Sequence, residues 1–207
     1  MRKSMLGIAV AMLLLSILAV SQDKDAPMKS MKSGMKKAEI SDATYAAQAV
    51  SAAPKAVAKD AGVIRMGADG KMRSLRESKN GFTCMIMEGN KMCSDANSMA
   101  FFGAMMKGET PTDKLGLSYM LAGDDGASNT DPKAMKKTAD NHWVVTGPHI
   151  MITGGAAKTL GLTEDKDPDP TKPYMMWAGT PYEHAMVPVG GTAKSMAKPA
   201  MAMPEKK

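Results

Sequence analysis

The chain has 207 residues and a formal net charge of +6, and only 4% of its residues are aromatic. This length fits one domain with additional segments. The positive charge lies toward the ends: residues 61–190 carry 14 basic and 15 acidic side chains, whereas residues 22–60 and 191–207 together carry eleven lysines. A domain without a basic excess argues against a nucleic-acid-binding protein.

The first 21 residues have the pattern of a secretory signal peptide. Arg2 and Lys3 precede an apolar run from Leu6 to Val20, and Ala19 and Ser21 are the small residues that a signal peptidase reads, so we expect cleavage before Gln22. A membrane anchor is the alternative, but this run is shorter than the ~20 residues that a transmembrane helix needs. We therefore expect a periplasmic or secreted protein whose mature chain has no transmembrane segment.

The mature chain is expected to contain one folded domain between two tails. Residues 22–60 predict a mobile linker rich in lysine, methionine and alanine, because they carry few large apolar groups and Pro54 interrupts the one plausible helix. Residues 61–190 predict a single α+β domain. Residues 191–207 predict a disordered tail rich in methionine and lysine.

Strands come in groups within the predicted domain. The stretch GVIRMGADGKMRSLRE indicates a hairpin about an Asp-Gly turn at residues 69–70, and GFTCMIM indicates a third strand. A helix is expected to begin after Ser94 or Asp95 and to stop at Gly108. Further strands are expected in GLSYMLAG, HWVVTGPHIMIT and PYMMWAGTPYEHAMVPV, with a short helix in AAKTLGL. This order predicts an α+β fold with a small, mostly antiparallel sheet and one or two packed helices.

Cys84 and Cys93 are the only cysteines in the chain. They form no C-x-x-C redox motif, and two thiols without a nearby histidine do not make a closed zinc site. In an oxidising compartment such a pair predicts a disulfide, which would close a short loop between the end of a strand and the start of the helix. The alternative is a free, reactive Cys93 thiol at the helix N-terminus.

Methionine is unusually frequent, with 23 residues, of which three lie in the first 21. Within predicted helices and strands it can replace leucine as a core-filling side chain. Six others lie in the tails, where no core is expected, and thioethers are soft ligands that select ions such as Cu(I). Against metal binding, the tails contain no histidine and have interleaved lysines. A periplasmic copper- or silver-binding protein is nevertheless the alternative function, with Met28, Met31, Met35, Met196, Met201 and Met203 as ligands.

The stretch WAGTPYEH is the predicted functional surface, because a bend directly after a strand can present aromatic and polar side chains together. The alternative is that Trp177 packs in the core and His184 bonds to the backbone. His142, His149 and His184 lack the spacing of a metal site but could converge. The candidate binding residues are Trp143, His149, Trp177, Tyr182 and His184.

No catalytic motif accompanies these residues. An enzyme that uses His184 and Glu183 as acid and base would need a nucleophile or a metal that the sequence does not reveal. We therefore expect a non-catalytic protein without a cofactor, which binds a small molecule or a component of the cell envelope.

The ordered stretches LRESKNGFTCM, MCSDANSMAFFGAMM, YMLAGDDGASNTDP and MMWAGTPYEHAMV give the chain a family resemblance. It resembles small secreted bacterial proteins with the motif order N-G-[WF]-T-C-M, M-C-x-D, T-D-P and W-A-G-T-P-Y-x-H, over about residues 62–189. The resemblance implies one extracytoplasmic domain with paired cysteines, and it implies no activity. The chain differs from the family in having Phe82 where tryptophan is common and in its methionine-rich tails.

Overall fold

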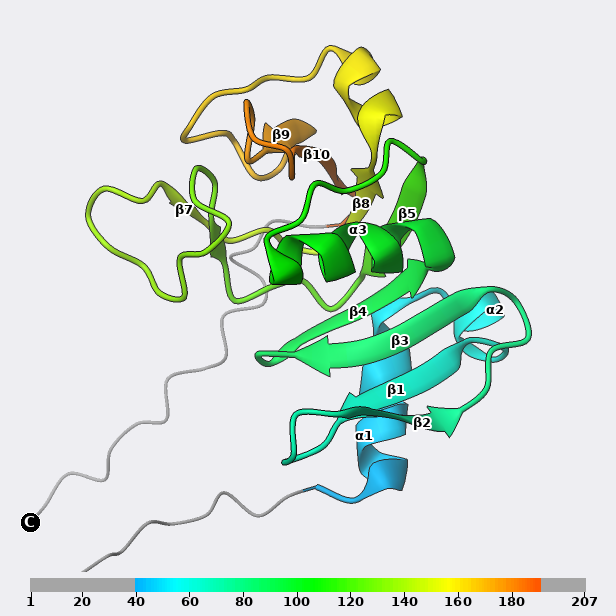
Figure 1. The fold of residues 1–207 in the computed structure, drawn as a ribbon. Coiled ribbons are helices and arrows are strands. Elements are labelled where there is room, and N and C mark those ends of the chain that lie inside the picture. The colour runs from blue at the N-terminus through cyan, green and yellow to red at the C-terminus, as the bar shows by residue number, and fades with distance from the viewer. Residues whose placement is uncertain (1–39, 191–207) are drawn as a thin grey trace, which may run out of the picture. The chain divides into compact units, whose positions relative to one another are not determined.

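A computed structural model describes residues 40–190, and they form the predicted α+β fold (Figure 1). In chain order the elements are α1 (Asp42–Ala49), η1 (Val50–Ala52), α2 (Lys55–Ala58), β1 (Gly62–Met66), β2 (Met72–Arg76), β3 (Phe82–Met87), β4 (Asn90–Asp95), α3 (Ala96–Lys107), β5 (Gly116–Met120), β6 (Ala127–Ser128), β7 (Trp143–Val144), β8 (His149–Thr153), η2 (Gly155–Leu160), β9 (Tyr174–Met176) and β10 (His184–Pro188). None of the helices in this part of the chain is long and apolar enough to cross a membrane.

The main sheet has eight strands in the order β2-β1-β3-β4-β5-β8-β10-β9. Strands β1 and β3 run parallel, while the other neighbours in this sheet run antiparallel. Strands β6 and β7 form a separate antiparallel pair within the long connection between β5 and β8. The sheet is therefore mostly antiparallel, as predicted.

Local signals placed the first hairpin and the long helix correctly. Strands β1 and β2 pair around the turn that contains Gly70, whose φ is 75°. Helix α3 begins after Asp95, whose carboxylate accepts a hydrogen bond from the Ser98 amide at 2.8 Å. It ends at Gly108 in the left-handed conformation with φ 72°, which glycine adopts without the steric cost of a side chain.

The strand β4 was not predicted, and it changes the place of the disulfide. Glu88 and Gly89 connect β3 to β4 with φ of 52° and 90°, so both central residues of this two-residue hairpin are left-handed. Cys84 and Cys93 are cross-strand neighbours in the hairpin and are bonded to each other. The predicted disulfide is confirmed, but the expected position of Cys93 at the start of the helix is wrong.

The predicted mobile linker is wrong for residues 42–58, which contain α1, η1 and α2. Small side chains explain the error: Ala49 and Ala52 are fully buried against the sheet, although a segment with few large apolar groups resembles a linker in sequence. Pro54 does interrupt the helix, and it becomes the residue preceding α2. The predicted signal peptide, the remainder of the linker and the C-terminal tail lie outside residues 40–190.

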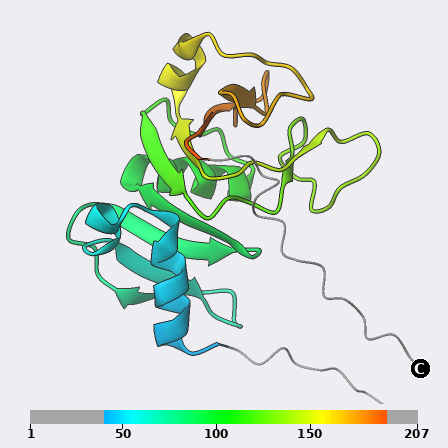
Figure 2. The same ribbon diagram turned by 180° about the vertical axis from the view of Figure 1, so that it is seen from behind.

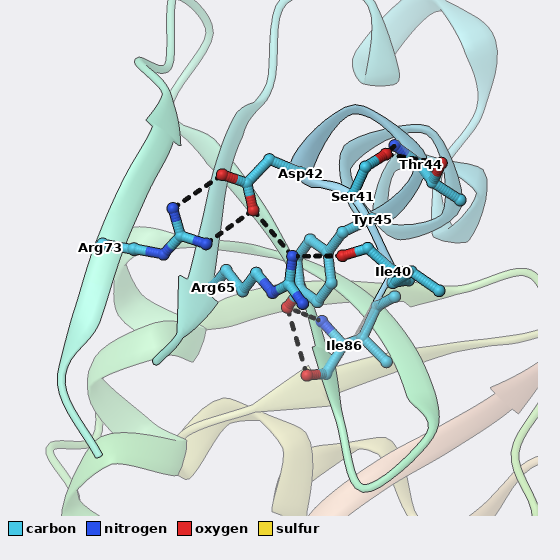
Figure 3. Close-up of polar contacts among 8 residues, drawn as sticks. All are labelled: Ile40, Ser41, Asp42, Thr44, Tyr45, Arg65, Arg73 and Ile86. Atoms are coloured by element: carbon cyan, nitrogen blue, oxygen red, sulfur yellow. Dashed lines mark hydrogen bonds and ion pairs between the residues drawn. The ribbon is translucent and has the colours of Figure 1, made fainter. Parts of the chain in front are cut away.

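Side-chain contacts fix α1 to the sheet (Figure 3). The Asp42 carboxylate accepts hydrogen bonds from Arg65 at 2.7 Å and from Arg73 at 2.6 Å. The Tyr45 hydroxyl accepts from the Ile86 amide at 2.8 Å and donates to the Ile86 carbonyl at 3.3 Å. These contacts join α1 to β1, β2 and β3, so the folded domain begins about twenty residues earlier than predicted.

Two different cores lie on the two faces of the sheet, because successive side chains of a strand point to opposite faces. Helices α1 and α3 cover opposite faces (Figures 1 and 2). We call the α1 side the disulfide face; it is built mainly from small side chains, including Ala49, Ala52, Val63, Cys84 and Cys93. We call the α3 side the methionine face; it includes Met85, Met92, Met120, Met151 and Met186.

Candidate functional site: a methionine-lined cavity

A cavity of about 160 Å³ lies between α3 and the methionine face of the sheet. Met106 and Glu88 are lining residues that are exposed to solvent, whereas His149 and His184 are lining residues that are buried. Phe102 adds apolar surface from α3. We call it the methionine cavity, because eight methionines line it: Met87, Met92, Met105, Met106, Met120, Met151, Met176 and Met186.

Strand register brings these side chains together. His149 and Met151 are two residues apart on β8 and therefore face the same side of the sheet. Met120 of β5 is the cross-strand partner of His149, and Met186 of β10 is the partner of Met151. His184 begins β10 and reaches the same face by the same alternation. One sheet face thus carries imidazole and thioether groups side by side.

His149 presents an unpartnered nitrogen in this wall. Its Nδ1 is 2.7 Å from the Gly147 carbonyl oxygen, and since a carbonyl only accepts, Nδ1 carries the proton and Nε2 carries a lone pair. Burial lowers the pKa of His149, although the bond to Gly147 opposes this shift, so the imidazole is neutral. Within residues 40–190, three buried side-chain polar atoms lack a hydrogen-bond partner, and His149 Nε2 is the one whose residue lines the cavity.

Asp124 is the carboxylate nearest to this nitrogen. Its Oδ1 accepts hydrogen bonds from the Thr146 and Gly126 amides at 2.9 Å and 3.0 Å. Its Oδ2 lies 4.0 Å from His149 Nε2, which is too far for a hydrogen bond. Burial raises the pKa of Asp124 to about 6, against the opposing effect of the two amides. At neutral pH the cavity therefore holds two acceptor atoms, 4.0 Å apart, that no donor within residues 40–190 satisfies.

His184 is buried among aromatic rings. Its Nδ1 donates to the Tyr182 carbonyl at 3.0 Å, and its ring lies 4.9 Å from Trp177 and 5.8 Å from Phe102, centre to centre. Burial lowers the pKa of His184 to about 4, with the Tyr182 carbonyl opposing and His149 adding a smaller effect. Both cavity histidines are thus neutral bases at physiological pH.

The stretch WAGTPYEH, which is predicted to form the functional surface, has mostly buried aromatic and polar side chains, and its functional role stays a prediction. Trp177, Glu183 and His184 are all buried, and Trp177 Nε1 donates to the Ser128 carbonyl at 2.8 Å. The alternative interpretation, with Trp177 in the core and His184 bonded to the backbone, describes the local packing correctly. Both residues nevertheless line the cavity from inside.

The five candidate binding residues occupy three different places in the structure. His149, Trp177 and His184 share the methionine cavity. Trp143 lines a neighbouring pocket of about 280 Å³, to which Trp177 also contributes. Tyr182 is half-buried against the methionine core and lines neither of these two pockets.

The three histidines do not converge, and the proposed acid–base pair does not form. His142 lies apart from the cavity, with its Nδ1 2.9 Å from Asp167. Glu183 accepts a hydrogen bond from the Gly179 amide at 2.9 Å, and no hydrogen bond joins it to His184 in the part of the chain that the structure describes. These contacts give the two side chains separate structural roles.

The sequence analysis did not predict that the core methionines and Asp124 line the same cavity as His149 and His184. Alternation in HIMIT and HAMV placed His149 with Met151 and His184 with Met186 on common strand faces, and this signal could have been used. Asp124 lies in the turn-like stretch AGDDG and carried no such signal. The tail methionines proposed as copper ligands lie outside residues 40–190: Met28, Met31, Met35, Met196, Met201 and Met203.

Comparisons with protein-family models, curated proteins and solved structures find no match to this chain. The resemblance to small secreted bacterial proteins therefore stays a prediction. Within residues 40–190, no group of three or more His, Cys, Asp or Glu side chains is arranged to hold a metal ion.

Proposed function

We propose that this chain is a non-catalytic periplasmic or secreted protein that binds a small ligand in the methionine cavity. The observation that carries the proposal is the unpartnered Nε2 of His149 in an apolar wall. Leaving a buried acceptor without a partner costs about 1–3 kcal/mol. A ligand that supplies the missing partner recovers that free energy on binding, whereas a purely structural core would be more stable without the acceptor.

The size and chemistry of the cavity restrict the ligand. An apolar cavity of about 150 Å³ holds one benzene molecule or a xenon atom, so the methionine cavity admits a ligand no larger than about one ring. Methionine sulfur makes favourable contacts with aromatic rings. His149 Nε2 and Asp124 Oδ2 act as acceptors at neutral pH, so the ligand supplies a hydrogen-bond donor or a positive charge.

The disulfide supports the proposed location. Cys84 and Cys93 are completely buried and bonded to each other, and such bonds persist in oxidising compartments outside the cytoplasm. The partner compatible with this location is a component of the cell envelope that inserts a small side chain into the cavity.

Three single-ring probes test the proposal with the purified chain. We expect phenol to bind more tightly than benzene or anisole, since its hydroxyl can donate to His149 Nε2 and anisole has lost that donor. Binding would be followed by calorimetry and by methionine methyl NMR.

A pair of matched variants locates the binding. Ala127 lines the cavity, so Ala127→Leu should fill it and abolish phenol binding. Ala100 is exposed on α3, so Ala100→Leu adds the same atoms outside the cavity and should leave binding unchanged. Equal binding by both variants would overturn the proposal.

A further inference from the structure

We infer that the ligand of the methionine cavity is a soft monovalent metal ion, Cu(I), held by His149 Nε2 and the thioethers of Met120 and Met151. This inference rests on the proposed function and names the chemical class of its ligand. It differs from metal binding by the tails, because all three ligands belong to the folded sheet.

The imidazole of His149 is already arranged as a metal ligand. Histidines that bind metals commonly donate their other ring N–H to a backbone carbonyl, which fixes the tautomer and the ring orientation. His149 Nδ1 makes this contact with Gly147 at 2.7 Å. The remaining nitrogen, Nε2, is buried and unpartnered, and its residue lines a cavity that is rich in thioethers. No proton has to leave this nitrogen before an ion binds.

Strand register places the side chains of Met120 and Met151 next to His149 on one face of the sheet. Met120 is the cross-strand partner of His149, and such partners have Cβ atoms ~5 Å apart. Met151 follows on the same strand face two residues later. Methionine has three flexible side-chain torsions, so each sulfur can move toward an ion at Nε2 without a backbone shift.

The donor set favours a soft ion over a hard divalent one. Residues 40–190 contain no cluster of three His, Cys, Asp or Glu side chains that could hold a metal ion, so zinc-like coordination lacks protein ligands there. Thioethers select Cu(I), and imidazole also suits copper. The Asp124 carboxylate lies 4.0 Å from Nε2. It would add negative charge near the cation, but a single carboxylate does not make a binding site for a hard divalent ion.

Silver(I) in chloride-free buffer without reductant is the probe of choice. Ag(I) is a soft ion that needs no reducing agent, so the Cys84–Cys93 disulfide stays intact during the measurement. We expect the purified chain to bind Ag(I), and the ε-methyl NMR signals of Met120 and Met151 to shift on titration.

Isosteric variants separate a ligand role from a packing role. Leucine replaces methionine with little loss of stability, so Met120→Leu combined with Met151→Leu removes both sulfurs from a folded chain. We expect the Ag(I) affinity of the cavity to fall at least about tenfold. Met85 belongs to the same core but does not line the cavity, so Met85→Leu is the matched control and should leave the affinity unchanged.

His149→Gln provides a second test, with His142→Gln as its control because His142 lies outside the cavity. Loss of Ag(I) affinity in the first variant and retention in the second is the expected result. Circular dichroism and cooperative thermal unfolding would show whether His149→Gln still folds. If it does not fold, the paired leucine variant decides the question.

Three results would overturn the inference, and they can be told apart. If the cavity variants bind Ag(I) unchanged, the sulfurs of the sheet are not ligands. If phenol binds but Ag(I) does not enter the cavity, the inference fails while the proposed function stands. If neither binds, both fail. Metal binding belongs to the tails instead if it survives in the cavity variants and disappears on leucine substitution of Met28, Met31, Met35, Met196, Met201 and Met203.

Discussion

The two faces of the sheet solve the packing problem in different ways, although β3 and β4 contribute to both. On the disulfide face, small side chains such as Ala49 and Ala52 let α1 and η1 approach the strands closely, and Cys84–Cys93 adds a covalent bond. On the methionine face, long flexible side chains leave a cavity of about 160 Å³. Under the proposed function, stability and ligand binding would therefore depend on opposite faces of one sheet.

The largest expected effect comes from removing α1 and α2 from the disulfide face. A chain that lacks residues 1–38 keeps Tyr45 and Ala49, so we expect it to melt cooperatively near the temperature of the full chain. A chain that lacks residues 1–60 exposes Val63 and the disulfide, so we expect it to lose cooperative unfolding. Differential scanning calorimetry compares the two. Equal melting of both truncations would show that residues 39–60 add nothing to the fold.

Removing the disulfide tests the same face more locally. The cysteines are 9 residues apart in sequence, and loss of a native disulfide typically costs about 2–5 kcal/mol in the free energy of unfolding. We expect Cys84→Ala with Cys93→Ala to lower that free energy within this range, as measured by urea denaturation. Phenol binding under native conditions should persist, because the cavity lies on the other face. If a folded variant without the disulfide lost phenol binding, the cavity would depend on the disulfide on the opposite face.

The titratable groups of the methionine face predict two opposite effects of pH. The pKa of His184 is lowered from 6.5 to about 4 in the folded chain. Between these two pH values the unfolded chain binds a proton at His184 and the folded chain does not. The free energy of unfolding therefore decreases as the pH falls below 6.5. One pKa unit corresponds to about 1.4 kcal/mol, so His184 alone accounts for about 3 kcal/mol between pH 7 and pH 4. His149, whose pKa is also lowered, acts in the same direction.

Asp124 acts in the other direction over the same interval. Because its pKa is raised to about 6, its contribution to stability is present at pH 4 and is lost as the pH rises through 6. We therefore expect Asp124→Asn to deepen the loss of stability on acidification, by up to about 3 kcal/mol, and His184→Gln to reduce that loss. Urea midpoints at pH 7 and pH 4 measure both. Identical pH profiles for the two variants would contradict the burial of these groups.

The smallest expected effect compares two tyrosine hydroxyls. The Tyr45 hydroxyl forms hydrogen bonds with both the amide and the carbonyl of Ile86. Tyr45→Phe should therefore lower the free energy of unfolding by about 1–2 kcal/mol. The Tyr182 hydroxyl makes no hydrogen bond within residues 40–190, so Tyr182→Phe should cost close to nothing. Chemical denaturation of both variants measures the difference. A larger cost for Tyr182→Phe would assign that hydroxyl a role on the methionine face.

Features encoded over a few residues were predicted well from the sequence. The Asp-Gly turn, the N-cap of α3 at Asp95 and the end of α3 at Gly108 are each determined by residues close together in the sequence. The pairing of Cys84 with Cys93 was predicted from the expected oxidising compartment and from the even number of cysteines. The β4 strand was missed because its hairpin turn, Glu88–Gly89, lacks the Asn-Gly or Asp-Gly signature.

Features that depend on tertiary packing could not be predicted. The alanines of α1 give no hydrophobic pattern strong enough to suggest burial, and they become core only because the sheet offers small side chains opposite them. The cavity depends on strand order, since β5, β8 and β10 are neighbours in space but not all in sequence. His149, Trp177 and His184 are predicted binding residues that line the methionine cavity in the structure, and their role in binding stays a prediction.

Xenon binding tests most directly whether the methionine face holds an open site. The measurement is the methyl NMR spectrum of the chain, labelled at methionine methyl groups, with and without xenon pressure. We predict that the signals of Met120, Met151 and Met186 shift, as expected for an apolar cavity of this size, while that of Met85 does not. Unchanged signals from all cavity methionines would show that the face is packed closed and would contradict the account.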